Sequence, residues 1–352
     1  MDAAWSGPRR SQRPGRPDPR RSRAAVGWLA AVVVVSQVVL TAAIQRPGSR
    51  LCDPEYAAKR QRLLARRADH PGHPVHVFLG SSRVFMGVRA GALADYPAAG
   101  EPLVVNFGAL GAGPILQALT YDRLVRGDTR PDGVTVEFWP PFFMAAGPYR
   151  EDERIDPNTL NGADLPFVTR YVHDPDRFTG NRRAAVLAPS YYHRFLLLNL
   201  TLPRWLSGAK RVDHKWRDDD DWGWQPICND PRPDQRPGRL AAVHAYYGPC
   251  LAAGVADPHA VRAFEDLLDE CGRTGTRLAV VWMPESSEFR SWYPHGVEAW
   301  ADDYFAGLRQ HFGATLIDAR RWMADGDLYD GFHLTPAGAA AFTERLRREG
   351  WQ

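Results

Sequence analysis

Five short apolar runs that alternate with helical patterns constrain the fold of this chain more than any other feature. Each run is bounded by turn-forming residues, as is typical of buried parallel strands. The runs are residues 75–79, 103–107, 134–138, 278–282 and 314–317. The helical patterns are residues 114–125, 260–271, 297–312 and 335–348. Because alternating strands and helices form a parallel sheet covered on both faces, we expect a three-layer α/β/α domain with about five parallel strands.

Residues 139–256 interrupt this alternation. They are rich in Trp, Tyr, Pro and Asp, and they separate the third apolar run from the fourth. A connection of that length must contain structure of its own or lie over a site as a lid. We therefore interpret it as an insertion within a single domain that covers residues 72–352.

The N-terminus carries a separate signal, a basic tail followed by a long uncharged run. Seven arginines and two aspartates give residues 1–23 a charge of +5, which leaves −2 for the rest of a chain whose total is +3. The tail is rich in Pro, Arg, Ser and Gly, so we expect it to be disordered. The slightly acidic remainder gives no electrostatic reason to expect a nucleic-acid partner.

Residues 24–44 carry no charge and are dominated by Ala and Val. At about 1.5 Å per residue, a helix of this length spans the roughly 30 Å hydrocarbon core of a bilayer. Arg20, Arg21 and Arg23 lie just before it and favour a cytoplasmic N-terminus. A cleaved signal peptide is the alternative, although the run is longer than the usual apolar region of such peptides.

The sequence therefore predicts a single-pass membrane protein with its main domain, residues 72–352, outside the cytoplasm. We expect the tail at 1–23, the anchor at 24–44 and a charged helical stalk within 45–71. The four cysteines fit this location without establishing it. Cys228 and Cys250 are the expected disulfide, and Cys52 and Cys271 are either free or paired with each other. No Cys-x-x-Cys motif is present, so no structural zinc site is expected.

Ser82 comes directly after the first apolar run. In an open α/β sheet, ligands bind outside the carboxyl ends of the strands. A serine there can begin the next helix, with its own amide directed at a developing oxyanion. Taken alone, the segment is more typical of a polar turn between a strand and a helix.

Asp330 and His333 lie three residues apart, just before the last helical pattern. A serine hydroxyl needs a base to take its proton, and the base needs a partner that fixes its tautomer. The two residues can supply both functions from one loop. The alternative is a loop whose polar residues only cap the following helix, for which Thr335 already suffices.

Together the two motifs resemble those of the SGNH, or GDSL-like, hydrolase superfamily. Gly80-Ser81-Ser82 is similar to the family's nucleophile block, with Ser81 in place of the usual aspartate, and Asp330 and His333 match its last block. The resemblance covers residues 72–138 and 257–350 and leaves the insertion unmatched. It implies a flavodoxin-like core and a Ser82–His333–Asp330 triad that needs no metal or organic cofactor.

The resemblance also implies an oxyanion hole built from the amides of Ser82 and a glycine after the second strand. Gly111 is the expected donor, and Gly108 is the nearby alternative. The family's third block supplies an asparagine, but here the matching segment ends in Glu137-Phe138-Trp139. A missing donor costs about 100- to 1000-fold in rate where it is used. The Trp139 indole or a residue of the insertion could replace it.

The resemblance implies serine-dependent acyl transfer, as an O-acyltransferase or esterase, on an extracytoplasmic substrate. Membrane-anchored relatives of this architecture include the alginate O-acetylation and teichoic acid D-alanine transfer proteins. The expected partners are an acylated small molecule or a cell-envelope glycan, together with a membrane-bound acyltransferase. The alternative is a catalytically weak or inactive domain that binds glycan or scaffolds such an acyltransferase.

Overall fold

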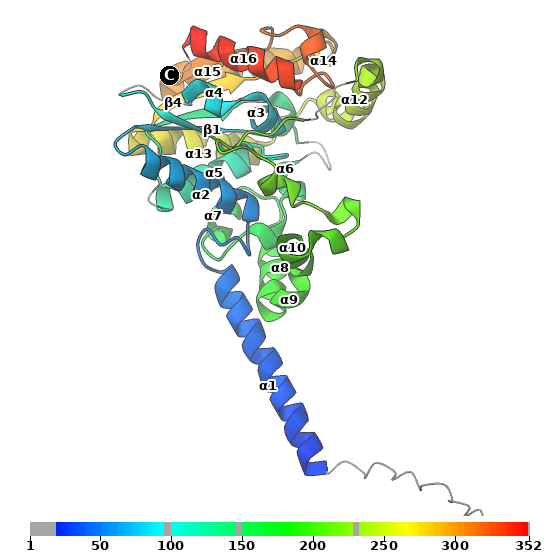
Figure 1. The fold of residues 1–352 in the computed structure, drawn as a ribbon. Coiled ribbons are helices and arrows are strands. Elements are labelled where there is room, and N and C mark those ends of the chain that lie inside the picture. Colours follow the sequence, from blue (N-terminus) through cyan, green and yellow to red (C-terminus); the bar gives the residue numbers. More distant parts are fainter. Residues whose placement is uncertain (1–18, 95–99, 128, 146–149, 228–231, 351–352) are drawn as a thin grey trace, which may run out of the picture.

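The computed structural model describes residues 19–94, 100–127, 129–145, 150–227 and 232–350. A parallel sheet of five strands, in the order β2-β1-β3-β4-β5, forms the centre of the molecule (Figure 1). The strands are β1 (Val75–Leu79), β2 (Leu103–Asn106), β3 (Gly133–Glu137), β4 (Arg277–Trp282) and β5 (Thr315–Asp318). The prediction of a three-layer α/β fold with five parallel strands is therefore confirmed.

The edge strand β2 and the neighbouring strands β1 and β3 are buried along their whole length, which explains their continuous apolar patterning. Val77 of β1 lies opposite Val105 on one side and Val134 on the other. The direction in which strands are added therefore reverses at β1. Such a reversal opens a crevice at the carboxyl ends of the strands, where ligands bind in folds of this type.

Helices cover both faces of the sheet (Figure 1). On one face α16 (Pro336–Glu349) packs against α3 (Ser82–Gly87) and α4 (Ala90–Ala94). On the other face α5 (Pro114–Arg126) packs against α13 (Pro258–Thr274), and α15 (His295–Phe312) lies against α13 and β5. The four predicted helices are confirmed, and Thr335 caps the last one by accepting a hydrogen bond from the Gly338 amide at 3.0 Å.

The expected stalk is instead part of the folded domain. Residues 54–69 form α2 (Pro54–Asp69), which contacts β2 and α11 (His214–Arg217). Tyr56 and Leu63 of α2 are buried in the main hydrophobic core. The sequence did not indicate this burial because seven of the sixteen residues of α2 are charged, yet Tyr56, Ala57, Ala58 and Leu63 are buried.

The insertion has helical structure of its own and extends the core beneath α5. Its longer helices are α8 (Pro175–Leu187), α10 (Arg194–Thr201) and α12 (Arg236–Ala253), and its short ones include α6 (Glu151–Arg154), α7 (Leu165–Val168) and α9 (Pro189–Tyr192). Val168 and Phe178 of the insertion form a second hydrophobic cluster with Leu119 of α5. The insertion is therefore more than a lid, because it adds a packed layer below the domain.

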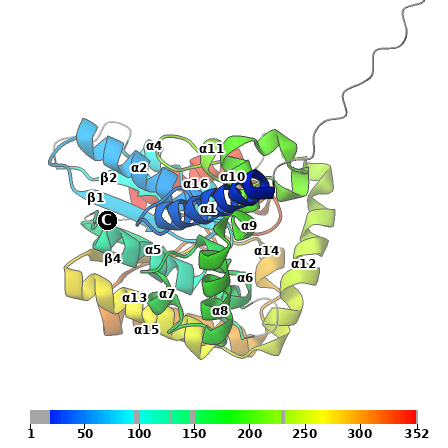
Figure 2. The same ribbon diagram turned by 90° about the horizontal axis from the view of Figure 1, so that it is seen from below.

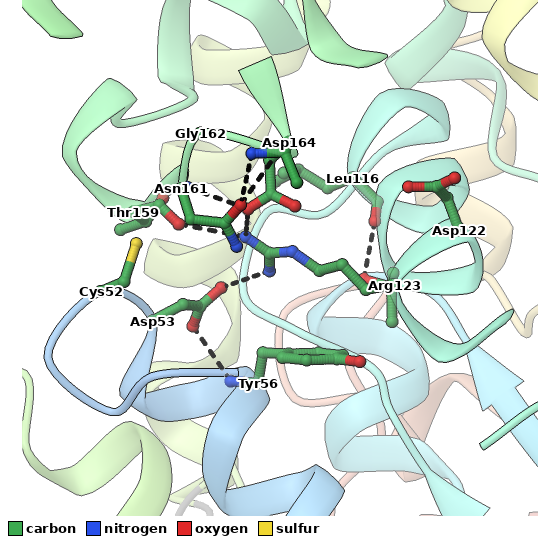
Figure 3. Close-up of polar contacts among 12 residues, drawn as sticks. Cys52, Asp53, Tyr56, Leu116, Asp122, Arg123, Thr159, Asn161, Gly162 and Asp164 are labelled. Atoms are coloured by element: carbon green, nitrogen blue, oxygen red, sulfur yellow. Dashed lines mark hydrogen bonds and ion pairs between the residues drawn. The ribbon is translucent and has the colours of Figure 1, made fainter. Parts of the chain in front are cut away.

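Arg123 of α5 joins three parts of the chain that are distant in sequence (Figure 3). Its guanidinium lies 2.7 Å from a carboxylate oxygen of Asp53, the N-cap of α2, and 2.8 Å from one of Asp164 in the insertion. Burial acts to raise the pKa of Asp164, but hydrogen bonds from Arg123 outweigh it and hold that pKa below its usual range. The start of α2, the central domain and the insertion are thereby held together.

The N-terminal helix α1 (Pro19–Ile44) extends away from the domain (Figures 1 and 2). It is long and apolar enough to cross a membrane, a test that signal sequences also pass. Near its C-terminal end it contacts the insertion. Thr41 Oγ1 donates to the Val186 carbonyl at 3.0 Å, and the Ser190 amide donates to Gln37 Oε1 at 3.2 Å.

Two sequence-based expectations fall on residues outside the described part of the chain. These are the disordered tail, of which 1–18 are not described, and Cys228 of the expected disulfide. Within the described residues Cys52, Cys250 and Cys271 are free and buried. The possible pairing of Cys52 with Cys271 is therefore wrong, and the free thiol of Cys250 does not support its pairing with Cys228.

Removing the Arg123 side chain tests the link between the start of α2, the central domain and the insertion. We expect Arg123→Met to lower the free energy of unfolding by about 3 kcal/mol, because it leaves a buried carboxylate with one cation fewer. Chemical denaturation of the full chain in detergent, followed by circular dichroism, measures the change. Arg273→Ala, which removes an exposed ion pair with Glu270, should cost less than about 1 kcal/mol. Equal losses in the two variants would contradict the assigned role of Arg123.

Candidate active site

Ser82 is the first residue of α3, directly beyond the carboxyl end of β1. Its amide therefore belongs to the first turn, whose N–H groups have no partner within the helix. Ser81 is the N-cap, and its hydroxyl accepts a hydrogen bond from the Arg83 amide at 3.2 Å. A β-carbon at Gly80 would lie 2.3 Å from the Val84 side chain, so the tight turn before the serine requires glycine.

His333 and Asp330 approach Ser82 from the loop that precedes α16. The distance from His333 Nε2 to Ser82 Oγ is 2.7 Å, and that from His333 Nδ1 to Asp330 Oδ2 is 2.8 Å. The second carboxylate oxygen of Asp330 accepts from the His333 amide at 3.0 Å. The three residues singled out in the sequence thus lie in one hydrogen-bonded chain, with Ser82 and His333 both half-buried.

The carboxylate of Asp330 is held in its charged form. Burial acts to raise its pKa, but the adjacent His333 and the hydrogen bonds from the His333 side chain and backbone lower it, and the net result is a pKa below the usual range. A charged Asp330 accepts a hydrogen bond from a protonated Nδ1 of His333. The other ring nitrogen, Nε2, then directs a lone pair toward Ser82. This is the tautomer in which the histidine can take a proton from the serine hydroxyl.

The insertion supports the loop that carries the histidine. Arg236 and Arg239 of α12 donate to the carbonyls of Leu328 and Tyr329 at 3.2 and 2.9 Å. Within the loop, the Tyr329 amide donates to the His333 carbonyl at 2.7 Å. The position of His333 therefore depends on a helix that the resemblance to known families does not cover.

Arg83 lies fully buried next to Ser82 and links the ends of three strands. Its guanidinium donates to the Met283 carbonyl beyond β4 at 2.7 Å and lies 3.5 Å from carboxylate oxygens of Glu137, at the end of β3, and Glu285. Glu137 in turn accepts from the Ser81 amide at 2.6 Å. Burial raises the pKa of both glutamates, and the charge of Arg83 opposes that rise. These ionic groups form the floor of the site.

Sequence reasoning did not assign a role to this cluster. The signal was present, because Glu137 ends an apolar strand and Glu285 follows another strand after one proline and one methionine. A charged residue at the end of a buried run requires a partner, since an unpaired buried charge is costly. The partner, Arg83, is adjacent in sequence to the predicted nucleophile.

The Trp139 indole is unavailable as an oxyanion donor, contrary to the possibility raised by the sequence. Its N–H donates to Glu285 Oε1 at 3.0 Å, and the ring is almost completely buried. Trp139 instead stacks on Phe332, with ring centroids 5.0 Å apart, and Phe332 contacts the His333 ring. The side chain therefore packs beneath the histidine loop rather than donating to a substrate.

The structure distinguishes between the two candidate glycines for the oxyanion hole. The Gly108 amide donates to Asn106 Oδ1 at 2.8 Å, so it is already engaged. Gly111 lies in a turn with φ +72°, a conformation that favours glycine. Gly111 thus stays the candidate donor, together with the amide of Ser82.

No group of three or more metal-ligating side chains occurs among the residues that the structure describes. A serine with a hydrogen-bonded histidine and a charged aspartate is an arrangement suited to nucleophilic attack on a carbonyl carbon.

Comparisons with known proteins add no functional assignment. No family model and no curated protein matches the chain. Among solved structures, it is similar to one described as "a putative platelet activating factor from Streptococcus pneumonia". The identity is 11%, the match covers 83% of this chain and 92% of that chain, and the TM-score is 0.34. A likeness at that level identifies neither a family nor an activity.

The lowered pKa of Asp330 predicts how the stability of the site depends on pH. Its contribution is complete above the usual carboxyl pKa of about 4 and is lost as the pH falls through the lower pKa of the folded chain. Asp330→Asn removes this contribution. The difference in free energy of unfolding between the parent chain and the variant should therefore shrink from about pH 6 to about pH 3. Urea unfolding across that range measures it, and a constant difference would contradict the prediction.

Proposed function

We propose that this chain is a serine-dependent acyl-transfer enzyme of the SGNH type. The observation that carries the proposal is the chain of short contacts from Ser82 to His333 at 2.7 Å and from His333 to Asp330 at 2.8 Å. It lies at the carboxyl edge of a parallel sheet, where ligands bind in such folds. The distances fall within the range in which a base can take the proton of a nucleophile.

In the proposed reaction His333 Nε2 accepts the proton of Ser82 while Oγ attacks the carbonyl carbon of an ester or thioester. The carbonyl π electrons move to oxygen, and that oxyanion faces the amides of Ser82 and Gly111. Collapse of the tetrahedral intermediate breaks the bond to the alcohol or thiol, which leaves with the proton from His333. Water or a sugar hydroxyl then attacks the acyl-enzyme, with His333 again acting first as base and then as acid.

The anchor helix supports an extracytoplasmic location for this reaction. Arginines precede the apolar segment of α1, which favours a cytoplasmic N-terminus and a domain on the opposite side of the membrane. We propose that the acceptor is a cell-envelope glycan and that a membrane-bound acyltransferase supplies the acyl group. The large insertion, which lies between the anchor and the sheet, favours transfer to a bulky acceptor over simple hydrolysis.

One observation favours a second candidate, a catalytically weak domain that binds glycan or scaffolds an acyltransferase. The family's asparagine is absent, and the nearby Trp139 N–H is bonded to Glu285. Two oxyanion donors in place of three would lower the rate by about 100- to 1000-fold where the third donor is used. The intact contact between Ser82 and His333 favours the enzyme.

Covalent labelling tests the assignment of the nucleophile. We expect a serine-directed fluorophosphonate to label the full-length chain and Ser82→Ala to abolish labelling, because the activated hydroxyl is gone. Mass spectrometry of the labelled peptide identifies the site. Ser287→Ala, which removes a hydroxyl at the same edge of the sheet, should leave labelling unchanged. Labelling at another residue in the Ser82→Ala variant would contradict the proposal.

Product analysis separates transfer from hydrolysis. With an acetylated donor and a defined oligosaccharide, we expect acetyl groups to appear on the oligosaccharide faster than acetate appears in solution. The expectation follows from the proposed glycan acceptor, which competes with water for the acyl-enzyme. Acetate release that is unaffected by the oligosaccharide would instead identify an esterase.

A further inference from the structure

Arg154, at the end of α6, is a partly buried arginine that forms no salt bridge with the described residues. Its charge acts on the nearby Glu151, but the carboxylate oxygens of Glu151 accept hydrogen bonds from the amides of Gly113, Ile115 and Leu116 instead. The Nε and Nη2 atoms of Arg154 are inaccessible to solvent and have no hydrogen-bond partner among the described residues. By contrast, the partly buried Arg62 and Arg320 are paired with Asp219 and Asp302. Because a buried guanidinium normally has an anionic or carbonyl partner, its absence here points to a ligand.

Arg154 lies beside the loop that contains the proposed oxyanion donor. A β-carbon at Gly111 would be 3.2 Å from Arg154 Nη1, so the guanidinium lies directly against that glycine. The Arg154 guanidinium also packs over the Phe142 ring, 4.7 Å from its centroid, and Phe142 contacts Trp139 beneath the histidine loop. The unpaired charge is therefore on the side of the molecule where the substrate carbonyl would lie.

The environment of Tyr247 supports the same placement. Burial raises the pKa of Tyr247, the charge of Arg154 opposes this rise, and the charge of Asp330 adds to it. The charges of Arg154 and Asp330 therefore both act on the Tyr247 hydroxyl. Tyr247 also packs against Phe332, with ring centroids 5.6 Å apart, next to His333.

A cavity adjoins Arg154 and the same loop. Its volume is about 190 Å³, and its wall includes Ala109, Leu110 and Ala112 on either side of Gly111. Sites that enclose a whole drug-sized ligand measure roughly 300–1,000 Å³. A smaller cavity of this kind fits one substituent of a substrate whose remainder lies outside it.

The charges around the cavity favour an anionic substituent. Lys59, Arg154 and Lys215 line it together with the acidic residues Glu55 and Asp156 and the ion-paired Asp53 and Arg123. Burial raises the pKa of Glu55 to about 7, although Lys59 and Lys215 oppose the rise, so Glu55 carries only part of a negative charge near neutral pH. Burial lowers the pKa of Lys59 to about 8, so Lys59 keeps most of its charge near neutral pH. The four cations that line the cavity therefore outnumber its three acidic groups, one of which is only partly charged.

We infer that Arg154 binds a carboxylate or phosphate group of the acyl donor or acceptor and so selects anionic substrates for the Ser82 site. The inference rests on the proposed acyl-transfer function and adds a substrate class to it. Carboxylate and phosphate oxygens both suit the fork of a guanidinium, which donates two parallel hydrogen bonds to them. Occupation of the cavity would provide the partner that Arg154 lacks.

Three matched acetate esters test this selection in the full-length chain in detergent. They are methyl 4-acetoxybenzoate, which is neutral, 4-acetoxybenzoate, which carries a carboxylate, and 4-acetoxyphenyl phosphate. We expect Arg154→Gln to lower kcat/KM for one or both anionic esters by about 10- to 100-fold, the loss of one charge-assisted hydrogen bond. The neutral ester should change less than about twofold. The two anionic arms distinguish a carboxylate from a phosphate.

Two further variants sharpen the kinetic test. Arg154→Lys keeps the charge and should recover part of the lost kcat/KM. Arg177→Gln removes an arginine of the insertion that pairs with Glu153, and it should leave all three esters unchanged. Equal losses on neutral and anionic esters would overturn the inference, because Arg154 would then act on the oxyanion common to all three. Unchanged kinetics with all three would overturn it as well.

Binding measurements keep this inference separate from the proposed function. In the Ser82→Ala chain, calorimetry should detect binding of 4-acetoxybenzoate or 4-acetoxyphenyl phosphate, and adding Arg154→Gln should weaken that binding by about 10-fold or more. Absence of fluorophosphonate labelling together with Arg154-dependent binding would contradict the enzyme but not the anion site. Labelling at Ser82 with no Arg154-dependent binding would contradict the anion site alone.

Discussion

The buried ion cluster of Arg83, Glu137 and Glu285 is the interaction on which the candidate site depends. Two carboxylates and one guanidinium share a region from which water is excluded, so each is stable there only with the others in place. The cluster connects the first residues of α3 with the ends of β3 and β4. The Ser81 amide donates a hydrogen bond to Glu137 of this cluster, which fixes the backbone at Ser81. The position of Ser82, the next residue, is thereby fixed as well.

The fold was largely predictable because each strand of a parallel sheet is buried on both faces and therefore reads as an apolar run. The meeting of Ser82, His333 and Asp330 in one hydrogen-bonded chain was predictable for a related reason. Ser82 follows the first run, while Asp330 and His333 precede the last helix, and the topology brings these two points to the same edge. Reactive residues that lie next to clearly predicted strands or helices can be placed in the fold as soon as those strands and helices are predicted.

The remaining features depend on contacts between distant segments, which no local pattern encodes. Helix α2 is charge-rich and gave no indication of burial, although Tyr56 and Leu63 lie in the core. The choice between Gly108 and Gly111 depended on the Asn106 side chain, which engages one of the two amides. Trp139 suits the role of oxyanion donor by residue type, but its N–H donates to Glu285 instead.

The contacts of Gln37 and Thr41 with the insertion restrict how far the domain can move relative to the N-terminal helix. A flexible linker lets an enzyme swing through a wide volume above a bilayer, so that distant polymers come within reach. Here α1 contacts the insertion directly, and the ion pair between Arg123 and Asp53 holds the segment between α1 and the domain in place. If α1 spans a membrane and Ser82 carries out the proposed acyl transfer, the reaction takes place at one fixed height above the lipid, and any acyl acceptor has to be delivered to that height.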